Sequence, residues 1–556
     1  MTSNIADNRL GTGQPYFGVS SRFWTLIAVA AFAVGALILF FSAPHNGEFW
    51  WSDAPRHALN GVFLADLVSA WPADPKAWAI NYYLQHPALT ILFYPPLFYI
   101  ISAPFFLLFG VSHATALAVE ELHYFALALG LFFLTRRCTG PFVAIAVGLS
   151  AMAAPGVAFW GRQVMLDIPS VAFLTWSTVA FTSHLRTKRP ALLYFAAALA
   201  LAAIYTKINT VIILPVFALA LLVSRGRAIF VDKHVWIAGA LLVIGLVPIA
   251  ILTLKFGSAN VQSVTGIADS QVSRHSLAGW IWYARRFPWL VGWPILGLSL
   301  MTPILALARP AKYPLNAAET VLLVGWFVVG YIALSLIDLK DGRFVTLIAP
   351  PILISAGLAV SMLWPGEKIA QLVFAVAVIA TGAYTLEFVP VAAVSGYREA
   401  AQWIAKNTPR HAIVLFSGKR DGSYIFNLRT FTDRGDISTI RVDKLLLTIS
   451  VRRTLGVSAK ALSETQIAQM LDDDGVQYVV AQADFWTDIP VMNRFQNVLK
   501  SSHFVKLLTI PVVANVPSED KTVSIYKNLG RVNPHPKPLE MPLAIIGSSV
   551  KGNVGK

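Results

Sequence analysis

The sequence predicts an all-α polytopic membrane domain with about eleven spans and outer-face juxtamembrane helices, followed by a small α/β soluble outer domain. Of the 556 residues, 56% are hydrophobic and 13% are charged, whereas soluble domains average about 45–50% apolar and about 25% charged residues. The single cysteine, Cys138, excludes internal disulfides and multi-cysteine metal or redox motifs. These observations exclude an ordinary cytosolic enzyme, a coiled coil and a disulfide scaffold.

The spans are predicted from apolar windows that are long enough to cross a bilayer as helices. They lie near 22–42, 115–135, 141–159, 168–185, 191–206, 208–223, 235–254, 288–308, 319–337, 344–363 and 369–389. A further apolar stretch, 91–110, contains Pro95, Pro96 and Pro104, and proline breaks helices. We expect this stretch to stay on the outer side without crossing.

The basic residues favour that topology. If 91–110 does not cross, four basic clusters fall in cytoplasmic loops, as the positive-inside rule requires. They are Arg136-Arg137, Arg186/Lys188/Arg189, Arg225/Arg227/Lys233 and Arg309/Lys312. The N-terminus is then cytoplasmic and the C-terminus is outside. The same loops explain the net charge of +15 better than a nucleic-acid partner does.

This topology divides the chain into four parts. A cytoplasmic N-terminal tail (1–21) precedes a membrane domain (22–394) with outer loops at 43–114, 160–167 and 255–287. Residues 395–530 are predicted to form the outer α/β domain, because helix-like and strand-like patterns alternate there. We expect that domain to support the membrane domain or to bind an acceptor. The end of the chain, 531–556, is rich in Pro, Gly and Lys and is predicted to be disordered.

Two carboxylates at outer ends of apolar segments are the candidate catalytic residues. Asp53 follows Trp50 and Trp51, which favour the membrane–water interface; it is either a helix N-cap or a functional acid. Asp167 opens the span at 168–185, where a carboxylate is costly unless it is paired or functional. Arg162 is its candidate structural partner.

Cations and aromatic residues at the outer face are the candidate substrate-binding groups. Cations there bind lipid phosphates or only extend to the interface. Before Pro95-Pro96, Tyr94 marks either the entrance of a lipid-facing groove or a stiff turn. The candidates are Arg56, His57, His86, Tyr94, Arg162, Lys207, Lys340 and Arg343.

The sequence contains no firm metal motif. Asp53 and His57 are four residues apart and would share a metal on one helix face. A divalent cation, Mg or Mn, is compatible with the carboxylates, but no cofactor is required by the pattern.

Together these motifs resemble those of the polytopic C-type (GT-C) glycosyltransferases. The resemblance is greatest to the branch that holds the lipid A aminoarabinose transferases, the rhizobial lipopolysaccharide sugar transferases and the protein O-mannosyltransferases. The matching segments are Asp53-Ala54-Pro55-Arg56-His57, Tyr94-Pro95-Pro96-Leu97, Arg162 to Asp167, Thr206-Lys207, and Arg343 with Pro350-Pro351. Two positions depart from the family pattern: Ala54 stands where a second acid is frequent, and Tyr94 where some members have lysine.

The resemblance implies transfer of a sugar from a polyprenyl-phosphate donor to a hydroxyl acceptor, with inversion, on the periplasmic face of a bacterial inner membrane. It implies that Asp53 is the general base and that Asp167 orients the acceptor, tunes Asp53 or helps to hold a cation. Lys207 and Arg343 would stabilise the departing phosphate. Acceptor candidates are lipid A or lipopolysaccharide, another envelope glycan, or protein.

Three other functions stay open at this point. A lipid or sugar transporter would show repeated halves and polar groups near the bilayer midplane, and the sequence shows neither pattern. A non-catalytic assembly protein would leave the two outer acids unexplained. A ligase or polymerase that acts on lipid-linked glycans is an enzymatic neighbour that the sequence does not separate from a transferase.

Overall fold

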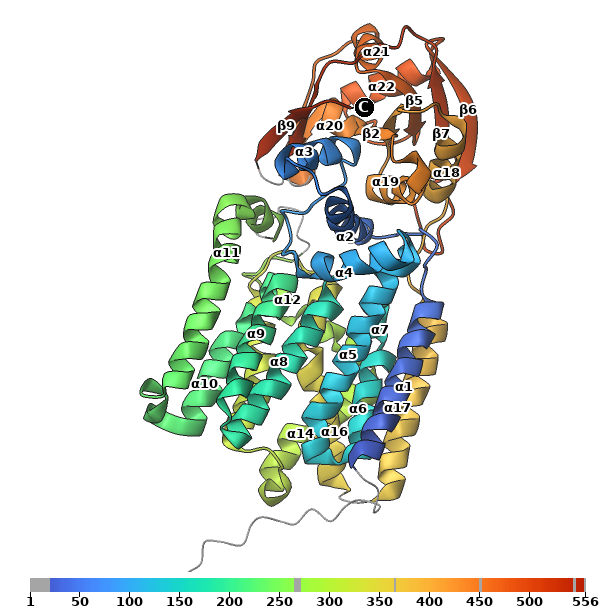
Figure 1. Ribbon diagram of the computed structural model, residues 1–556. Helices are drawn as coiled ribbons and strands as arrows, with labels where there is room; N and C mark the ends of the chain where they lie inside the picture. Colours follow the sequence, from blue (N-terminus) through green and yellow to red (C-terminus); the bar gives the residue numbers. More distant parts are fainter. Residues whose placement is uncertain (1–20, 265–271, 365–366, 450–452, 544–546, 555–556) are drawn as a thin grey trace, which may run out of the picture.

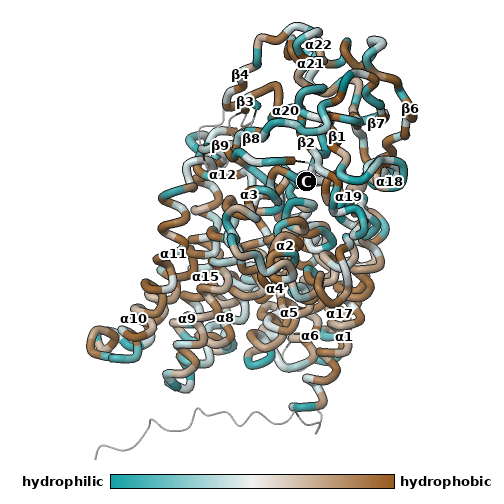
Figure 2. The backbone as a smooth tube through the Cα atoms, turned by 45° about the horizontal axis from the view of Figure 1, so that its top comes forward, coloured by the Kyte–Doolittle hydropathy of each residue, from teal (hydrophilic) through white to brown (hydrophobic). Residues whose placement is uncertain are grey.

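The computed structural model describes residues 21–264, 272–364, 367–449, 453–543 and 547–554. A bundle of long helices carries a smaller domain with a β-sheet at one end (Figure 1). Hydrophobic residues dominate the bundle, whereas the smaller domain is richer in hydrophilic residues (Figure 2). The predicted tail 1–21 lies outside the described residues except for Ser21, as does part of the predicted loop 255–287.

The bundle is built from helices that coincide with all of the predicted windows. They are α1 (Ser21–Ser42), α5 (His113–Thr139), α6 (Pro141–Ala153), α7 (Pro155–Gly161), α8 (Asp167–Thr187), α9 (Pro190–Thr206), α10 (Ile213–Arg225), α11 (Lys233–Val264), α14 (Trp293–Ala308), α15 (Ala317–Ser335), α16 (Ala349–Leu363) and α17 (Lys368–Phe388). Short helical segments join them: the 3-10 helices η2 (Ile208–Ile212), η3 (Gly226–Phe230) and η6 (Gly342–Ile348), and the α-helices α12 (Leu277–Ile281) and α13 (Phe287–Val291).

The helices of the structure that are long and apolar enough to span a membrane are fewer than the eleven predicted windows. Within the described residues, seven helices are long and apolar enough to cross a membrane, or up to nine if each bent pair is one span. The bends are 63° between α6 and α7 and 120° between the segment 277–291 and α14. The two remaining windows are α8, which carries polar residues on its buried side, and α9, which has 17 residues. Both pack within the bundle, against each other.

The direction of the helices separates the two ends of the bundle. The helices α5, α8, α10 and α14 each run away from the sheet domain, so the four basic clusters lie at the opposite end of the bundle (Figure 1). The long helix α11 has 32 residues. At 1.5 Å per residue it is about 48 Å long, which exceeds the roughly 30 Å hydrocarbon core. Its C-terminal part therefore rises beside the outer loops.

The first outer loop forms a layer between the bundle and the sheet domain. Its helices are α2 (Asp53–Ala70), α3 (Pro75–Gln85) and α4 (Leu97–Phe109). The helix α4 lies across the end of the bundle below α2 (Figure 1) and, with 13 residues, is not among the candidate spans. The apolar face of α2, with Leu59 and Val62, is fully buried and packs on α4 and on the sheet domain.

The alternating pattern predicted a small α/β domain, and the structure has one, built on a mixed sheet. Its five-stranded sheet has the order β2-β1-β5-β7-β6. Strand β1 pairs in parallel with β2 and β5, and β7 pairs antiparallel with β5 and β6. Its elements are α18 (Tyr397–Asn407), β1 (Ile413–Ser417), α19 (Asp421–Arg429), β2 (Ser438–Arg441), α20 (Val442–Leu445), β3 (Leu447–Ile449), β4 (Val457–Ala459), α21 (Glu464–Asp473), β5 (Val476–Ala481), α22 (Pro490–Lys500), β6 (Phe504–Pro511), β7 (Thr522–Asn528), β8 (Leu539–Leu543) and β9 (Ser548–Gly552).

The end of the chain differs from the disorder that its composition predicted. Within 531–556, β8 and β9 pair as an antiparallel hairpin. Met541 is fully buried, and the carbonyl of Pro542 accepts a hydrogen bond from the Tyr83 hydroxyl of α3 at 3.2 Å. The hairpin is therefore held by tertiary contacts to the first outer loop, which composition does not reveal.

Ion pairs join the first outer loop to the sheet domain. The Arg429 guanidinium donates two hydrogen bonds to the Asp66 carboxylate of α2, at 2.5 and 3.0 Å. The Tyr82 hydroxyl of α3 donates to the same carboxylate at 2.9 Å. Bidentate pairs of this kind fix orientation as well as adding energy. The sheet domain is thus held in one orientation above α2.

The close packing of α1, α5 and α6 yields a first testable prediction. A Cβ atom added at Gly148 of α6 would overlap the Phe32 ring and lie 2.8 Å from the carbonyl oxygen of Ala128. We expect Gly148→Ala to destabilise the protein by about 1–3 kcal/mol, the usual effect of overpacking. Thermal unfolding in detergent micelles measures this effect.

The matched control is Gly239→Ala in α11, where nothing lies within 4 Å of the added atom. Because alanine is the better helix former, this change is expected to be neutral or to stabilise the protein by up to about 1 kcal/mol. Equal stability of the two variants would contradict the tight α1–α5–α6 contact.

Candidate functional site

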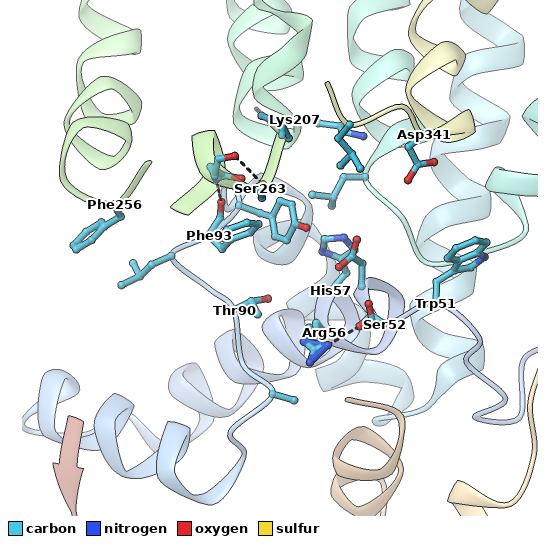
Figure 3. A pocket seen from close by; sticks show the side chains of 18 of the residues that line it. Trp51, Ser52, Arg56, His57, Thr90, Phe93, Lys207, Phe256, Ser263 and Asp341 are labelled. Atoms are coloured by element: carbon cyan, nitrogen blue, oxygen red, sulfur yellow. Dashed lines mark hydrogen bonds between the residues drawn. The ribbon is translucent and has the colours of Figure 1, made fainter. Parts of the chain in front are cut away.

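A cavity of about 820 Å³ lies between the outer end of the bundle, the first outer loop, α11 and the sheet domain. Its lining has three regions. An inner cluster on the membrane side consists of Asp53, Asp167, Lys207, Asp341 and Arg343, and a roof cluster consists of Arg56, Asp421, Arg441, Asp443 and Lys444. Residues of α11 form the third region, an apolar wall. Figure 3 shows Lys207 and Asp341 on one side of the cavity, Arg56 on the other and His57 between them.

Asp53 is ion-paired and is not the helix cap. It is the first residue of α2, whose N-cap is Ser52. Its carboxylate accepts a hydrogen bond from Arg343 Nη1 at 2.7 Å, and Arg343 Nε lies 3.1 Å from the Asp341 carboxylate. Burial disfavours the charged carboxyl, but the Arg343 guanidinium outweighs burial and holds the pKa of Asp53 at about 2. Asp53 is therefore ionised at every physiological pH.

Asp167 has a cation as its partner as well. At the first position of α8 it is 3% exposed, and the Lys207 ammonium, just after α9, lies 2.5 Å from its carboxylate. Lys207 Nζ and Arg343 Cζ lie 5.0 and 5.4 Å from the centre of the Phe344 ring. The two ion pairs thus converge on one side chain, and the cations of the inner cluster lie beside each other.

The side of α2 that carries Asp53 also presents a neutral histidine. His57 Nδ1 is 2.9 Å from the Tyr99 hydroxyl, and its ring packs edge-on against Tyr94 at 4.8 Å. Burial lowers the pKa of His57 to about 3, against the opposing charge of Asp53. The imidazole is therefore uncharged and available for hydrogen bonding.

A divalent cation has no assembled site in the part of the chain that the structure describes. No group of three or more His, Cys, Asp and Glu side chains comes together there. The partner of Asp53 is the guanidinium of Arg343.

The apolar wall faces the inner cluster from α11. Ile249, Leu252 and Phe256 line the cavity on this side. Further along α11, the Asn260 amide donates a hydrogen bond to the carbonyl of Phe93 at 2.6 Å. This bond joins α11 to the loop that precedes α4. An apolar surface next to paired cations suits an amphiphile with a phosphate head group.

The roof cluster was not found from the sequence. Asp421, Arg441, Asp443 and Lys444 lie in the sheet domain, and Asp421 is 365 positions from its partner Arg56. In the sequence these residues look like an ordinary solvated surface. Asp341, in contrast, is two positions before Arg343 in the sequence. This proximity to a predicted site residue could have identified it as part of the site.

The structure brings seven of the ten predicted site residues into the lining of the cavity. These are Asp53, Arg56, His57, Tyr94, Asp167, Lys207 and Arg343.

The other three residues lie elsewhere. His86 is buried against the Tyr82 ring, and Lys340 donates a hydrogen bond to the carbonyl of Ser335 at 2.7 Å. Arg162 is 2% exposed and donates to the carbonyls of Ala158 and Val389. Arg162 is therefore not the partner of Asp167, because main-chain carbonyls at the end of α7 and α17 bind its guanidinium.

Known proteins share this fold at low sequence identity. A family model described as dolichyl-phosphate-mannose-protein mannosyltransferase matches residues 94–252. This region contains Tyr94, Asp167 and Lys207 but not Asp53 or Arg343. Among curated proteins, none matches the chain.

Solved structures extend the similarity to nearly the whole chain. ArnT from Cupriavidus metallidurans bound to undecaprenyl phosphate is 14% identical with a TM-score of 0.60, over 93% of this chain and 100% of that one. Its apo form is 13% identical with a TM-score of 0.61, over the same shares of the chains. An oligosaccharyltransferase from Archaeoglobus fulgidus is 12% identical with a TM-score of 0.53, over 91% of this chain and 76% of that one. The protein has the ArnT-like fold, and the resemblance to C-type glycosyltransferases is confirmed at that level.

The Asp167–Lys207 pair yields the second prediction. Removing one partner of a buried ion pair leaves an uncompensated charge and costs about 3–5 kcal/mol. We expect Lys207→Met to lower the free energy of unfolding by that amount, and Asp167→Asn in the same chain to restore part of it. Chemical or thermal unfolding of the purified protein measures both changes.

The same substitution at Lys406 is the control. Lys406 is an exposed lysine of α18, and substitutions of exposed residues usually change stability by less than about 0.5 kcal/mol. If Lys207→Met were no more destabilising than Lys406→Met, Lys207 would not be compensating the buried carboxylate.

Proposed function

We propose that the protein is an integral membrane glycosyltransferase that moves a sugar from a polyprenyl-phosphate donor to a hydroxyl group of an envelope acceptor. The observation that carries this proposal is the inner cluster, in which three acids and two cations share one cavity with an apolar wall. The acceptor would be lipid A or lipopolysaccharide, another glycan, or protein. The bound undecaprenyl phosphate in the similar ArnT structure supports a lipid phosphate as the donor's carrier.

The donor would bind with its phosphate at the cations and its chain along α11. Lys207 and Arg343 supply the charge-assisted hydrogen bonds that a phosphate accepts. Ile249, Leu252 and Phe256 supply the apolar surface beside it. As the bond between the anomeric carbon and the phosphate oxygen breaks, these cations stabilise the negative charge that develops on the phosphate.

Asp53 would act as the general base. In the resting state it is a poor base, because the Arg343 guanidinium holds its pKa at about 2 and an effective base has a pKa near the working pH. A donor phosphate that binds Arg343 withdraws this guanidinium and brings its own negative charge. Both effects raise the pKa of Asp53. Donor binding therefore activates the base that deprotonates the acceptor hydroxyl.

Attack from the face opposite the phosphate would invert the anomeric carbon. The hydroxyl oxygen forms the new bond, its proton moves to Asp53, and the polyprenyl phosphate departs. Asp167 keeps Lys207 in place through the 2.5 Å contact, and His57 offers a neutral hydrogen-bonding group near the acceptor. Arg162, His86 and Lys340 do not line the cavity and take no part in these steps.

The proposed location is a bacterial inner membrane, with the N-terminus in the cytoplasm and the sheet domain in the periplasm. The basic clusters at the end of the bundle opposite the sheet domain favour this orientation. The cavity then opens on the side where nucleotide sugars are absent, which suits a donor dissolved in the membrane.

The third prediction tests the assignment of Asp53. Asp53→Asn should reduce transfer by about 10²–10⁴-fold, the usual contribution of a general base, while the protein remains folded and inserted. The measurement is mass spectrometry of envelope lipids and glycans from a strain that lacks the gene and is complemented with each variant. Wild type should restore one hexose- or pentose-sized mass that Asp53→Asn does not restore.

Asp74→Asn is the matched control, because Asp74 is an exposed N-cap of α3 in the same loop and asparagine caps a helix equally well. Equal restoration by Asp53→Asn and wild type would remove the base from the mechanism and favour a transporter.

The fourth prediction concerns the pH dependence of the reaction. Without Arg343, burial acts on Asp53 with less opposition, so the pKa of the carboxyl rises above about 2. A carboxylate base becomes protonated, and inactive, as the pH falls through its pKa. The acid limb of the plot of kcat/KM against pH should therefore move to higher pH in Arg343→Gln. The profile of kcat/KM for the donor that mass spectrometry identifies reports this pKa for the free enzyme. If Arg343→Gln lowered the rate but left the acid limb at the same pH, Arg343 would not control the pKa of Asp53.

A further inference from the structure

The roof cluster forms a second charged surface that the proposed transfer steps do not use. Arg56 of α2 and Arg441 of β2 each contact the same oxygen of Asp421, Oδ2, at 2.7 Å. Arg441 also forms hydrogen bonds with Asp443 at 3.0 and 2.5 Å. The side chains of these four residues are between 8% and 15% exposed. Two guanidinium groups are therefore fixed side by side above the cavity.

The cluster has more cations than carboxylates. Asp421 and Asp443 balance Arg56 and Arg441, which leaves the ammonium of Lys444. Lys444 contacts the hydroxyl and the ring face of Tyr83 on α3, and no ion pair to a carboxylate is found for it within the described residues. Lys444 lines the cavity as well. The roof therefore presents one uncompensated positive charge that is supported by two oriented guanidinium groups.

Helix geometry sets the relation between this surface and the proposed base. Arg56 follows Asp53 by three residues on α2, and residues at this spacing have Cβ atoms about 5–6 Å apart on one helix face. Arg56 is also anchored by a 3.0 Å hydrogen bond to the Ser52 carbonyl (Figure 3). The Cβ atoms of Asp53 and of Arg56, one member of the roof cluster, are therefore separated by about the length of one sugar ring.

We propose that the roof cluster binds an anionic group of the acceptor, a phosphate or a carboxylate that lies within about one sugar unit of the glycosylated hydroxyl. This inference rests on the proposed transferase function. The donor phosphate has its own cations in the inner cluster, so the two charged clusters serve the two substrates separately. A buried ammonium without a counter-ion is costly, and an anionic group of the acceptor would stabilise the charged form of Lys444.

The position of Lys444 makes binding at the roof pH-dependent. Burial lowers the pKa of Lys444 to about 7, with the charges of Arg441 and Arg56 acting in the same direction and those of Asp443 and Asp421 acting against it. The phenol of Tyr83 faces it from α3. The ammonium that binds an anion is therefore lost as the pH rises through this pKa.

Titration of the full-length protein in lipid nanodiscs tests the site. The probes are methyl glucuronide for a carboxylate, glucose 6-phosphate for a phosphate, and neutral methyl glucoside as the reference. We expect one of the anionic sugars to bind more tightly than methyl glucoside, and its identity distinguishes a carboxylate acceptor from a phosphate acceptor. Lys444→Met should weaken that binding about tenfold, which corresponds to about 1.4 kcal/mol. Lys406→Met, an exposed lysine of α18, should leave the binding unchanged.

A pH series with methyl glucuronide separates a direct role from a structural one. Between about pH 6 and about pH 8.5 the carboxylate of the probe does not titrate, but Lys444 loses its proton. Wild type should bind more weakly at the higher pH. Lys444→Arg, which stays charged, should bind with little dependence on pH.

The outcomes decide the proposal independently of the transferase assignment. Anionic and neutral sugars that bind wild type equally, or unchanged binding by Lys444→Met, overturn the roof site. Binding of undecaprenyl phosphate, measured separately, should be the same in wild type and Lys444→Met. If wild type fails to bind undecaprenyl phosphate, the proposed donor is wrong, whereas the sugar titrations still decide whether the roof binds anions.

Discussion

The structure of the site depends on the pairing of each acid of the inner cluster with a cation that a donor phosphate would need. Asp53 contacts Arg343 and Asp167 contacts Lys207. Charges that are withdrawn from water are costly unless they are paired, so these pairs, with Asp341 beside Arg343, allow five charges to lie together in the inner cluster. The same pairing means that an arriving phosphate must compete with carboxylates for both cations. In the proposed mechanism, substrate binding and activation of the base would thereby become one event.

The surrounding architecture keeps those pairs between two different environments. Helix α11 extends beyond the bilayer thickness and provides an apolar wall, while the Asp66–Arg429 pair holds the sheet domain over α2. A lipid-borne molecule and a polar molecule can thus reach the same carboxylate from different sides. The first outer loop is essential to this arrangement, because α2 carries Asp53 toward the inner cluster and Arg56 toward the roof.

The sequence predicted what local patterns determine and missed what distant contacts determine. The apolar windows found the bundle helices, and the cost of an unpaired carboxylate in a span drew attention to Asp167. The same reasoning chose Arg162 as its partner because it is near in sequence, but the chain returns through α9 and supplies Lys207 instead. The hairpin near Met541 was missed for the same reason: its contacts to α3 are more than 400 positions away, since Tyr83 and Pro542 differ by 459.

The location of the charges supports the proposed transferase over a transporter. A transported molecule must reach its site from both sides of the membrane, and transporter sites accordingly lie near the bilayer midplane. Here the acids and cations lie at one end of the bundle, under a soluble domain that ion pairs hold in place, while the basic clusters lie at the other end. In the proposed topology, a substrate in this cavity would be close to the outer surface throughout. The geometry suits a reaction between two molecules that meet at that surface, and the two charged clusters supply separate sites for them.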